Sequence, residues 1–202
     1  MLGSEARAAR LRLITDEEHY HWVIEKLLRE ARVSLFLSTA NAKDLRVEAP
    51  VGTRERAAGR HVSLLEILAS KVRAGVDVRF LHAGLPSRPF RKSLSAHPEL
   101  EGALRKCPRV HLKMIAKDGE LLYLGSANFT GAGLGARGVG RRNFELGVVT
   151  DDHVLLDRTQ ERFDRIWRGA ECAGCKLRRV CPEPIDLLEK RLAPRKKPAP
   201  KR

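Results

Sequence analysis

The residues best suited to chemistry lie in one short stretch of the chain, which begins near residue 109. Apolar and polar residues alternate there, so on a strand His111 and Lys113 share one face while Leu112 and Met114 share the other. The imidazole can act as a nucleophile or carry a proton, and the ammonium can hold a charged oxygen. The pattern therefore predicts a strand, over residues 109–116, with a reactive polar face.

The chain is then expected to turn back on itself. Asp118-Gly119 is a strong signal for a tight turn, and residues 120–124 have the composition of a returning strand. Ser126 and Asn128 follow, two residues apart, so they can again point the same way and add a hydroxyl and a carboxamide. An imidazole, an ammonium and these two neutral groups together suit a phosphate ester.

This pattern resembles the signature of the phospholipase D superfamily. The six matching positions are His111, Lys113, Asp118, Gly125, Ser126 and Asn128. The resemblance continues through a strand at 143–147 and covers about residues 15–168. It implies an α/β fold with a mixed sheet flanked by helices, to which a small C-terminal, cysteine-containing appendage is added. The alternative is a surface hairpin whose histidine and lysine are merely solvated.

The resemblance also implies a mechanism, in which a phosphodiester is cleaved without a metal in two displacements. His111 would attack phosphorus and form a phosphohistidine, which water then resolves. Lys113 and Asn128 would hold the non-bridging oxygens, and Ser126 would assist orientation. Glu145 is the best candidate to hydrogen-bond His111 and so to fix its tautomer.

Two features of the motif bear on its assembly. Asp118 lies at the turn, an odd number of residues after His111, so its side chain is expected on the opposite face. We therefore expect Asp118 to be structural. One histidine cannot be both nucleophile and acid in the same step, and no second His-x-Lys occurs in the chain. His82 follows a strand but lacks companion residues. We therefore expect a homodimer that brings two copies of His111 together, as in single-motif nucleases of this family.

The four cysteines form a second constellation. Cys172, Cys175 and Cys181 have the spacing C-x2-C-x5-C, and Cys107 is the remaining cysteine. This spacing resembles the three C-terminal cysteines of the iron–sulfur site in certain helicase-associated nucleases. Four thiolates also suit a structural zinc, so the hypothesis is a [4Fe–4S] cluster or zinc, with no cofactor for catalysis. Four unrelated thiols are the alternative.

Charge and length limit the function. The 202 residues carry a net charge of +14 with a pI near 10.2, which favours nucleic acid as partner, although an arginine-rich composition alone is the alternative. No run of 18 apolar residues and no apolar leader core occurs, so we expect a cytoplasmic protein without a membrane span. The leading hypothesis is a nuclease. A phospholipid hydrolase and a nucleic-acid-binding subunit of a larger assembly are the alternatives.

The expected organisation is a catalytic domain over 1–168, a cysteine-containing segment over 169–192 and a basic disordered tail over 193–202. Helices are expected at 15–31 (with Thr15 as N-cap), 62–74, 100–106, 151–167 and 185–192. Besides the motif, strands are expected at 32–38, 76–81 and 144–148, and loops at 42–60 and 83–98. The helix–strand order before the motif predicts parallel strands joined by crossovers.

Two further predictions concern a pair of histidines near the N-terminus and the segment that follows the motif. His19 and His21 cannot share a helical face, so both are expected at the surface or its boundary rather than as ligands. The segment 130–142 contains five glycines and three arginines beside the motif. It either wraps a phosphate backbone or is a mobile connector.

Overall fold

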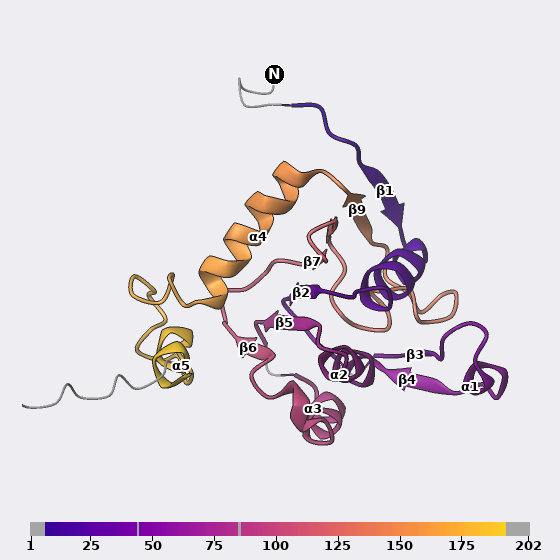
Figure 1. The fold of residues 1–202 in the computed structure, drawn as a ribbon, viewed down its shortest axis with the longest axis horizontal. Coiled ribbons are helices and arrows are strands. Elements are labelled where there is room, and N and C mark those ends of the chain that lie inside the picture. The colour runs from indigo at the N-terminus through magenta and orange to yellow at the C-terminus, as the bar shows by residue number, and fades with distance from the viewer. Residues whose placement is uncertain (1–6, 44, 85, 193–202) are drawn as a thin grey trace, which may run out of the picture.

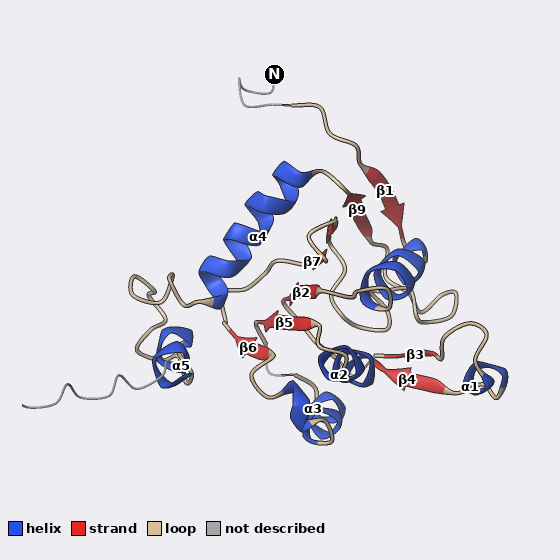
Figure 2. Cartoon of the chain, in the orientation of Figure 1, coloured by secondary structure: helices blue, strands red, loops and turns tan. Residues whose placement is uncertain are grey.

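The computed structural model describes residues 7–43, 45–84 and 86–192, and its central layer is a seven-stranded mixed sheet (Figures 1 and 2). The strand order is β1-β9-β8-β7-β2-β5-β6. The strands are β1 (Arg12–Thr15), β2 (Ser34–Thr39), β5 (Asp77–His82), β6 (Leu104–Lys106), β7 (Met114–Lys117), β8 (Leu121–Gly125) and β9 (Leu146–Thr150). A separate ribbon pairs β3 (Arg46–Glu48) with β4 (His61–Ser63).

Helices cover both faces of this sheet. The π-helix η1 (Tyr20–Leu28), α2 (Leu64–Arg73) and α3 (Arg88–Ser95) bury apolar side chains against one face. On the opposite face α4 (His153–Trp167) packs against Phe36, Met114 and Leu122 (Figure 1). The short helices are α1 (Arg54–Ala57), η2 (Pro98–Leu100) and α5 (Ile185–Leu192). These three layers confirm the predicted α/β class.

Strand directions bring several strand ends to one edge. β2 runs parallel to β5, as the helix–strand order predicted, and antiparallel to β7. The ends of β2, β5 and β8 therefore lie beside the starts of β7 and β9. We call this the motif edge, because the residues that precede β7 and β9 and follow β8 include the motif side chains.

The expectations for residues 83–106 were wrong. The predicted loop at 83–98 contains α3, which begins with Ser87 as N-cap, and Pro89 is tolerated in its first turn. The predicted helix at 100–106 is instead a turn followed by β6, whose residues pair in parallel with β5 from Phe80 to His82. Pairing with a neighbouring strand here overrides the local preference of the sequence.

The N-terminal region also differs from the prediction. Residues Arg12–Thr15 form β1, an edge strand paired with β9, and the helix begins only at Tyr20. Glu18 still accepts the backbone N–H of Thr15 at 2.9 Å, so the capping-box contact forms next to the strand. His19, expected at the surface, is fully buried, whereas His21 is exposed.

The remaining elements need smaller corrections. The strand predicted at 144–148 is β9, two residues later, and Phe144 is 97% exposed rather than packed. The predicted loop at 42–60 also contains β3 and α1. α4 begins as expected, with Asp152 accepting the N–H of Leu155 at 2.9 Å. In the part of the chain described here, no helix has both the length and the apolar character to cross a membrane. The predicted tail at 193–202 lies outside the described residues.

Candidate active site

The motif hairpin joins β7 to β8 through the predicted tight turn. Asp118 and Gly119 have φ angles of 54° and 69°, which fit a turn with two left-handed residues. β7 begins only at Met114, so His111 and Lys113 precede the strand. Ser38 Oγ donates to Leu112 O at 3.2 Å, and Gly125 N donates to Lys113 O at 3.1 Å. These bonds hold the two reactive residues beside the ends of β2 and β8.

His111 and Lys113 lie in direct contact. Lys113 Nζ is 3.1 Å from both ring nitrogens of His111. His111 is exposed, whereas Lys113 is half-buried. Burial lowers the pKa of the Lys113 ammonium, and the carboxylate of Glu145 acts in the opposite direction. The pair therefore combines an accessible imidazole with a cation that is partly withdrawn from water.

Glu145 and Ser126 form a second pair on this edge. Ser126 Oγ donates to Glu145 Oε2 in a short hydrogen bond, and Asn143 Nδ2 donates to Glu145 Oε1 at 3.0 Å. Ser126 Oγ also accepts the N–H of Leu146 at 3.1 Å. Among the described contacts, the Glu145 carboxylate thus binds Ser126 and Asn143. The predicted Glu145–His111 hydrogen bond is not formed in this arrangement.

Asn128 is oriented by residues that follow β2. Its Oδ1 accepts from Thr39 Oγ1 at 3.2 Å and from the N–H of Asn41 at 3.1 Å. Since Oδ1 is engaged, Nδ2 is the atom that can donate to a phosphate oxygen. A Cβ at Gly133 would lie 2.6 Å from the carbonyl oxygen of Asn128, so this position requires glycine. Thr39 and Gly133 therefore support Asn128, although neither stood out in the sequence.

Asp118 lies at the opposite end of β7 from His111. Its carboxylate accepts the backbone N–H groups of Arg32, Val33 and Ser34 at 2.7–3.1 Å. Burial alone would raise the pKa of this carboxyl, but the three N–H donors outweigh it and lower the pKa. Asp118 thus ties the hairpin turn to the start of β2 and does not reach the motif edge.

Sequence reasoning missed Asp16, which binds the backbone of Glu145. Asp16 donates its N–H to Glu145 O at 3.0 Å and accepts the Glu145 N–H on Oδ1 at 2.9 Å. Asp16 has the unusual φ of 40°. Its carbonyl also lies 3.0 Å from Nδ1 of the buried His19. No signal in the sequence points to Asp16, because its role depends on β1 pairing with β9.

Tyr123 explains two glycines around the site. Its buried ring lies edge-on to His19, with centroids 5.6 Å apart. A Cβ at Gly125 would overlap the Tyr123 hydroxyl, and one at Gly147 would lie 2.5 Å from the ring. Burial lowers the pKa of His19, while its bond to Asp16 and the charge of Glu145 act in the opposite direction. The glycine of the motif is therefore fixed by packing, and burial disfavours the charged form of His19.

The glycine- and arginine-rich segment 130–142 packs beside the motif. Leu134 is fully buried, and Asn143 N donates to Ala132 O at 3.1 Å. The segment borders two open hollows that share Arg137. One, of about 500 Å³, is lined by Arg46, Arg56, His61 and Arg142 among others, and the other, of about 440 Å³, by Lys43 and Thr130 among others. The segment thus borders two hollows that contain cations.

His82 lies at the end of β5, opposite Thr39 in the strand register. Its Nδ1 is 3.0 Å from Gly84 O, and burial lowers the pKa of its ring. These contacts account for one ring nitrogen of a largely buried side chain. His82 therefore resembles a packed histidine more than a second reactive one.

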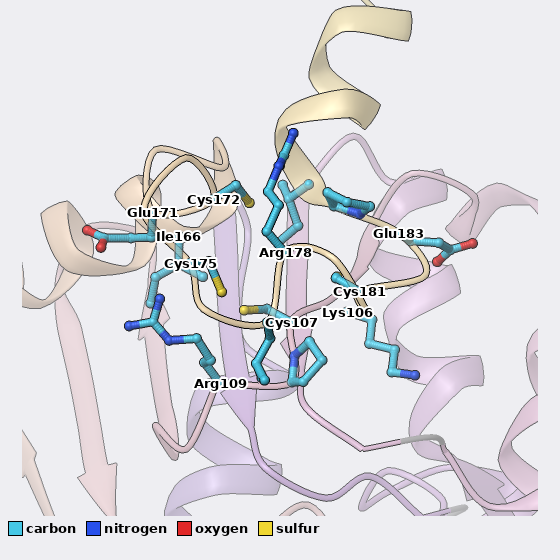
Figure 3. Close-up of a pocket in the computed structure, with 14 residues that line it drawn as sticks. Lys106, Cys107, Arg109, Ile166, Glu171, Cys172, Cys175, Arg178, Cys181 and Glu183 are labelled. Carbon is cyan, nitrogen blue, oxygen red and sulfur yellow. The ribbon is translucent and has the colours of Figure 1, made fainter.

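The four cysteines gather around one cavity of about 40 Å³ (Figure 3). We call the set Cys107, Cys172, Cys175 and Cys181 the cysteine pocket. Burial raises the pKa of the Cys107 thiol, whereas the backbone N–H of Leu177 lowers the pKa of Cys175. As the side chains stand in the described chain, no three potential ligands converge closely enough to hold a metal. The structure thus brings the predicted ligands together without closing them around one point.

Comparison with known proteins agrees with this architecture. The family model described as cardiolipin synthase, PLD-like domain, matches residues 4–167. Nuc from Salmonella typhimurium, a phospholipase D family member, is 18% identical with a TM-score of 0.52, over 80% of this chain and 95% of that chain. NucT from Helicobacter pylori is 14% identical with a TM-score of 0.52, over 78% and 95%. No curated protein sequence was found to match.

A mixed sheet with these groups at one edge is the architecture of the phospholipase D superfamily. Because the family match spans most of the sequence, this chain belongs to the phospholipase D-like family. At such identities the two solved structures show a shared fold. They leave the substrate to be argued from the site.

Proposed function

We propose that this protein is a nuclease that cleaves phosphodiesters at His111 without a catalytic metal. The observation that carries the proposal is the contact of His111 with Lys113 at an edge that also holds Ser126, Asn128 and Glu145. The edge combines an exposed nucleophile with a cation and with oriented donors for phosphate oxygens. Such fixed donors stabilise charge that develops in a transition state.

In the first displacement, a ring nitrogen of His111 forms a bond to phosphorus, and the bond from phosphorus to one ester oxygen breaks. The departing oxygen needs a proton, which a second acid must supply. Lys113 Nζ and Asn128 Nδ2 hold the non-bridging oxygens. In the second displacement, water attacks phosphorus, its proton passes to the group that acted as acid in the first step, and the bond from phosphorus to nitrogen breaks to release His111. Glu145 accepts a hydrogen bond from Ser126 and so orients its hydroxyl. The Glu145 carboxylate also stabilises the positive charge of Lys113.

The missing acid is a reason to propose a homodimer in which His111 of the partner subunit protonates the leaving group. The structure offers a surface for this contact. An exposed apolar strip follows β1 and β9 and reaches the residue before Glu145; its members are Leu11, Leu13, Phe144, Leu146 and the half-buried Val148. Four of these side chains are more than half exposed. A two-fold contact there would cover the strip and bring two motif edges together.

Nucleic acid is favoured as the substrate by the charges around the edge. The two hollows beside segment 130–142 contain Arg46, Arg137 and Lys43, besides two arginines that pair with Glu17 and Glu48, and the chain carries a net charge of +14. A polynucleotide supplies phosphates on both sides of the scissile bond, which such cations can hold. Cleavage should therefore weaken as salt rises.

The test is an assay on labelled single- and double-stranded DNA and RNA with EDTA present. Wild type should cleave at least one of these substrates, His111→Ala should not, and His153→Ala, which changes an exposed histidine of α4, should cleave like wild type. Cleavage that requires added Mg²⁺ and survives His111→Ala would contradict the mechanism. Tight binding without cleavage would favour the non-enzymatic alternative.

A phospholipid substrate is the second candidate, because the matching family model is described as cardiolipin synthase. The same proteins are therefore incubated with phosphatidylcholine vesicles. Robust hydrolysis of lipid, without cleavage of any nucleic acid, would replace the nuclease proposal.

The dimer is tested by light scattering and by mixing. Leu146→Glu should yield inactive monomers, whereas Val51→Glu, which alters an exposed residue of the loop before α1, should leave the dimer intact. In mixtures of wild type and His111→Ala, each mixed dimer keeps a single His111. Activity should then fall more steeply than the fraction of mutant chains. A fully active monomer would contradict the dimer.

A further inference from the structure

We propose that Cys107, Cys172, Cys175 and Cys181 bind one structural metal centre through four thiolates. This site is distinct from the motif edge, and nuclease activity is not required for it. It rests on how two separate parts of the chain meet, on hydrogen bonds to the sulfurs and on the surrounding charge.

The ligands come from segments far apart in the sequence. Cys107 directly follows β6, and its N–H donates to His82 O at 2.9 Å. The other three lie between α4 and α5, where successive turns place Cys172 N 3.0 Å from Gly169 O and Cys175 N 3.2 Å from Cys172 O. All four cysteines of the chain nevertheless line the same cavity. Such convergence is unexpected for four unrelated thiols.

Backbone groups are directed at two of the sulfurs. The backbone N–H of Arg109 lies near the thiol of Cys107, and those of Leu177 and Arg178 lie near the thiol of Cys175, where they favour the thiolate form. In both cases a donor lies two residues after its cysteine. Hydrogen bonds of this kind orient a thiolate and support it as a ligand. Figure 3 shows the sulfurs of Cys107 and Cys175 turned toward one another.

The surrounding charge suits an anionic centre. Three cations, Lys106, Arg109 and Arg178, line the cavity together with two carboxylates, Glu171 and Glu183, so the positive groups outnumber the negative ones. Four thiolates around a divalent ion leave an excess of about two negative charges. The cations beside the sulfurs offset part of that excess.

Four thiolates suit a structural zinc, which they coordinate tetrahedrally, and they also suit a four-iron cluster. Zinc is the simpler occupant, because four thiolates complete its coordination without inorganic sulfide. Four cysteine ligands leave no open position for substrate, so the role is structural. The centre would fasten the C-terminal segment to the connection that leads to His111.

The test measures zinc, iron and acid-labile sulfide per chain in anaerobically purified full-length protein. One zinc per chain is expected in wild type and in Ala173→Ser, which changes an exposed residue between two ligands. Cys175→Ser and Cys181→Ser should lose the metal. In wild type the thiols should react slowly until a strong chelator is added, and the chelator should lower Tm by several degrees.

Each outcome decides the proposal. Iron and sulfide in equal amounts would support the four-thiolate site and correct the metal from zinc to a cluster. Protein that contains neither metal and has four freely reactive thiols would overturn the site. If the cysteine variants fail to fold, the thiol reactivity and the metal content of the wild type still decide whether the four-thiolate site exists. None of these readouts depends on cleavage of nucleic acid.

Discussion

The motif edge and the cysteine pocket lie at the two ends of the same short segment, which begins with Cys107 and reaches His111. At the motif edge, side chains are held by strand register and by hydrogen bonds from β2, β8 and β9. In the cysteine pocket, three of the four proposed ligands stand in a run of turns between α4 and α5. The motif edge is therefore assembled by the sheet. The cysteine pocket brings its four cysteines near one another, but their sulfurs do not converge on one point.

This difference shows how each site depends on the rest of the chain. The sheet packs on both faces, so the motif edge should keep its geometry without any bound group. The cysteine segment contributes few apolar side chains to the core; Ile185 at the start of α5 is fully buried, and Cys172 packs against the same cluster. A metal would supply the missing constraint there. Variants at one site should therefore leave the other unchanged.

After the complete loss expected for His111→Ala, the largest effect should come from removing the cation at the motif edge. Lys113→Ala should lower kcat by about 10²–10³-fold, because it removes a preorganised charge from the transition state. Tm and metal content should stay at wild-type values. Lys176→Ala, which removes an exposed lysine from the cysteine segment, serves as the matched control. Loss of metal in Lys113→Ala would show that the two sites are coupled.

A smaller effect is expected from Thr39, a positioning residue for Asn128. Thr39→Val removes the hydroxyl that donates to Asn128 Oδ1 and accepts the N–H of Phe129, and it should lower kcat by about 10-fold with little change in KM. Thr39→Ser keeps the hydroxyl and should restore kcat. If both variants lose the same activity, the hydroxyl is not what orients Asn128.

Asp118 should affect stability more than rate. Asp118→Asn weakens hydrogen bonds to three backbone N–H groups and should cost about 2 kcal/mol, or about 4–8 °C in Tm, at pH 7. Because the pKa of Asp118 is lowered on folding, its contribution is present above the unfolded pKa near 4 and is lost as pH falls through the folded pKa. The difference from wild type should therefore shrink in acid. A large loss of kcat with unchanged Tm would assign Asp118 a catalytic role instead.

The smallest effect concerns His19. Its pKa is lowered on folding, so the unfolded chain binds its proton more readily, and stability should decline as pH falls below about 6.5. His19→Asn should reduce this decline by up to about 1 kcal/mol per pH unit, as urea unfolding at pH 7.5 and 5.5 would show. His21→Asn, at an exposed position of η1, should keep the wild-type slope. Equal slopes in all three proteins would mean that His19 does not titrate in this range.

The sequence predicts best the parts of the molecule that are governed by local signals. The Asp118-Gly119 turn, the parallel β2–β5 pair and the start of α4 at Asp152 all follow from residues close in sequence. β1 and β6 were missed because each is a short strand that exists through its partner. Asp16 and Thr39 were missed for the same reason, since each acts on a motif residue more than 85 positions away. The positions of the cysteines are evident in the sequence, but their convergence on one cavity is a property of the fold.

The most direct test of the central claim is to trap the intermediate on His111. Protein treated with EDTA is mixed with a slight excess of nucleic-acid substrate, quenched at alkaline pH during the first turnover and analysed by peptide mass spectrometry. We expect a nucleotidyl phosphoramidate on the peptide that contains His111, absent from His111→Ala and present in His153→Ala. Cleavage that proceeds at the same rate without any such adduct, or an adduct on another residue, would contradict the account.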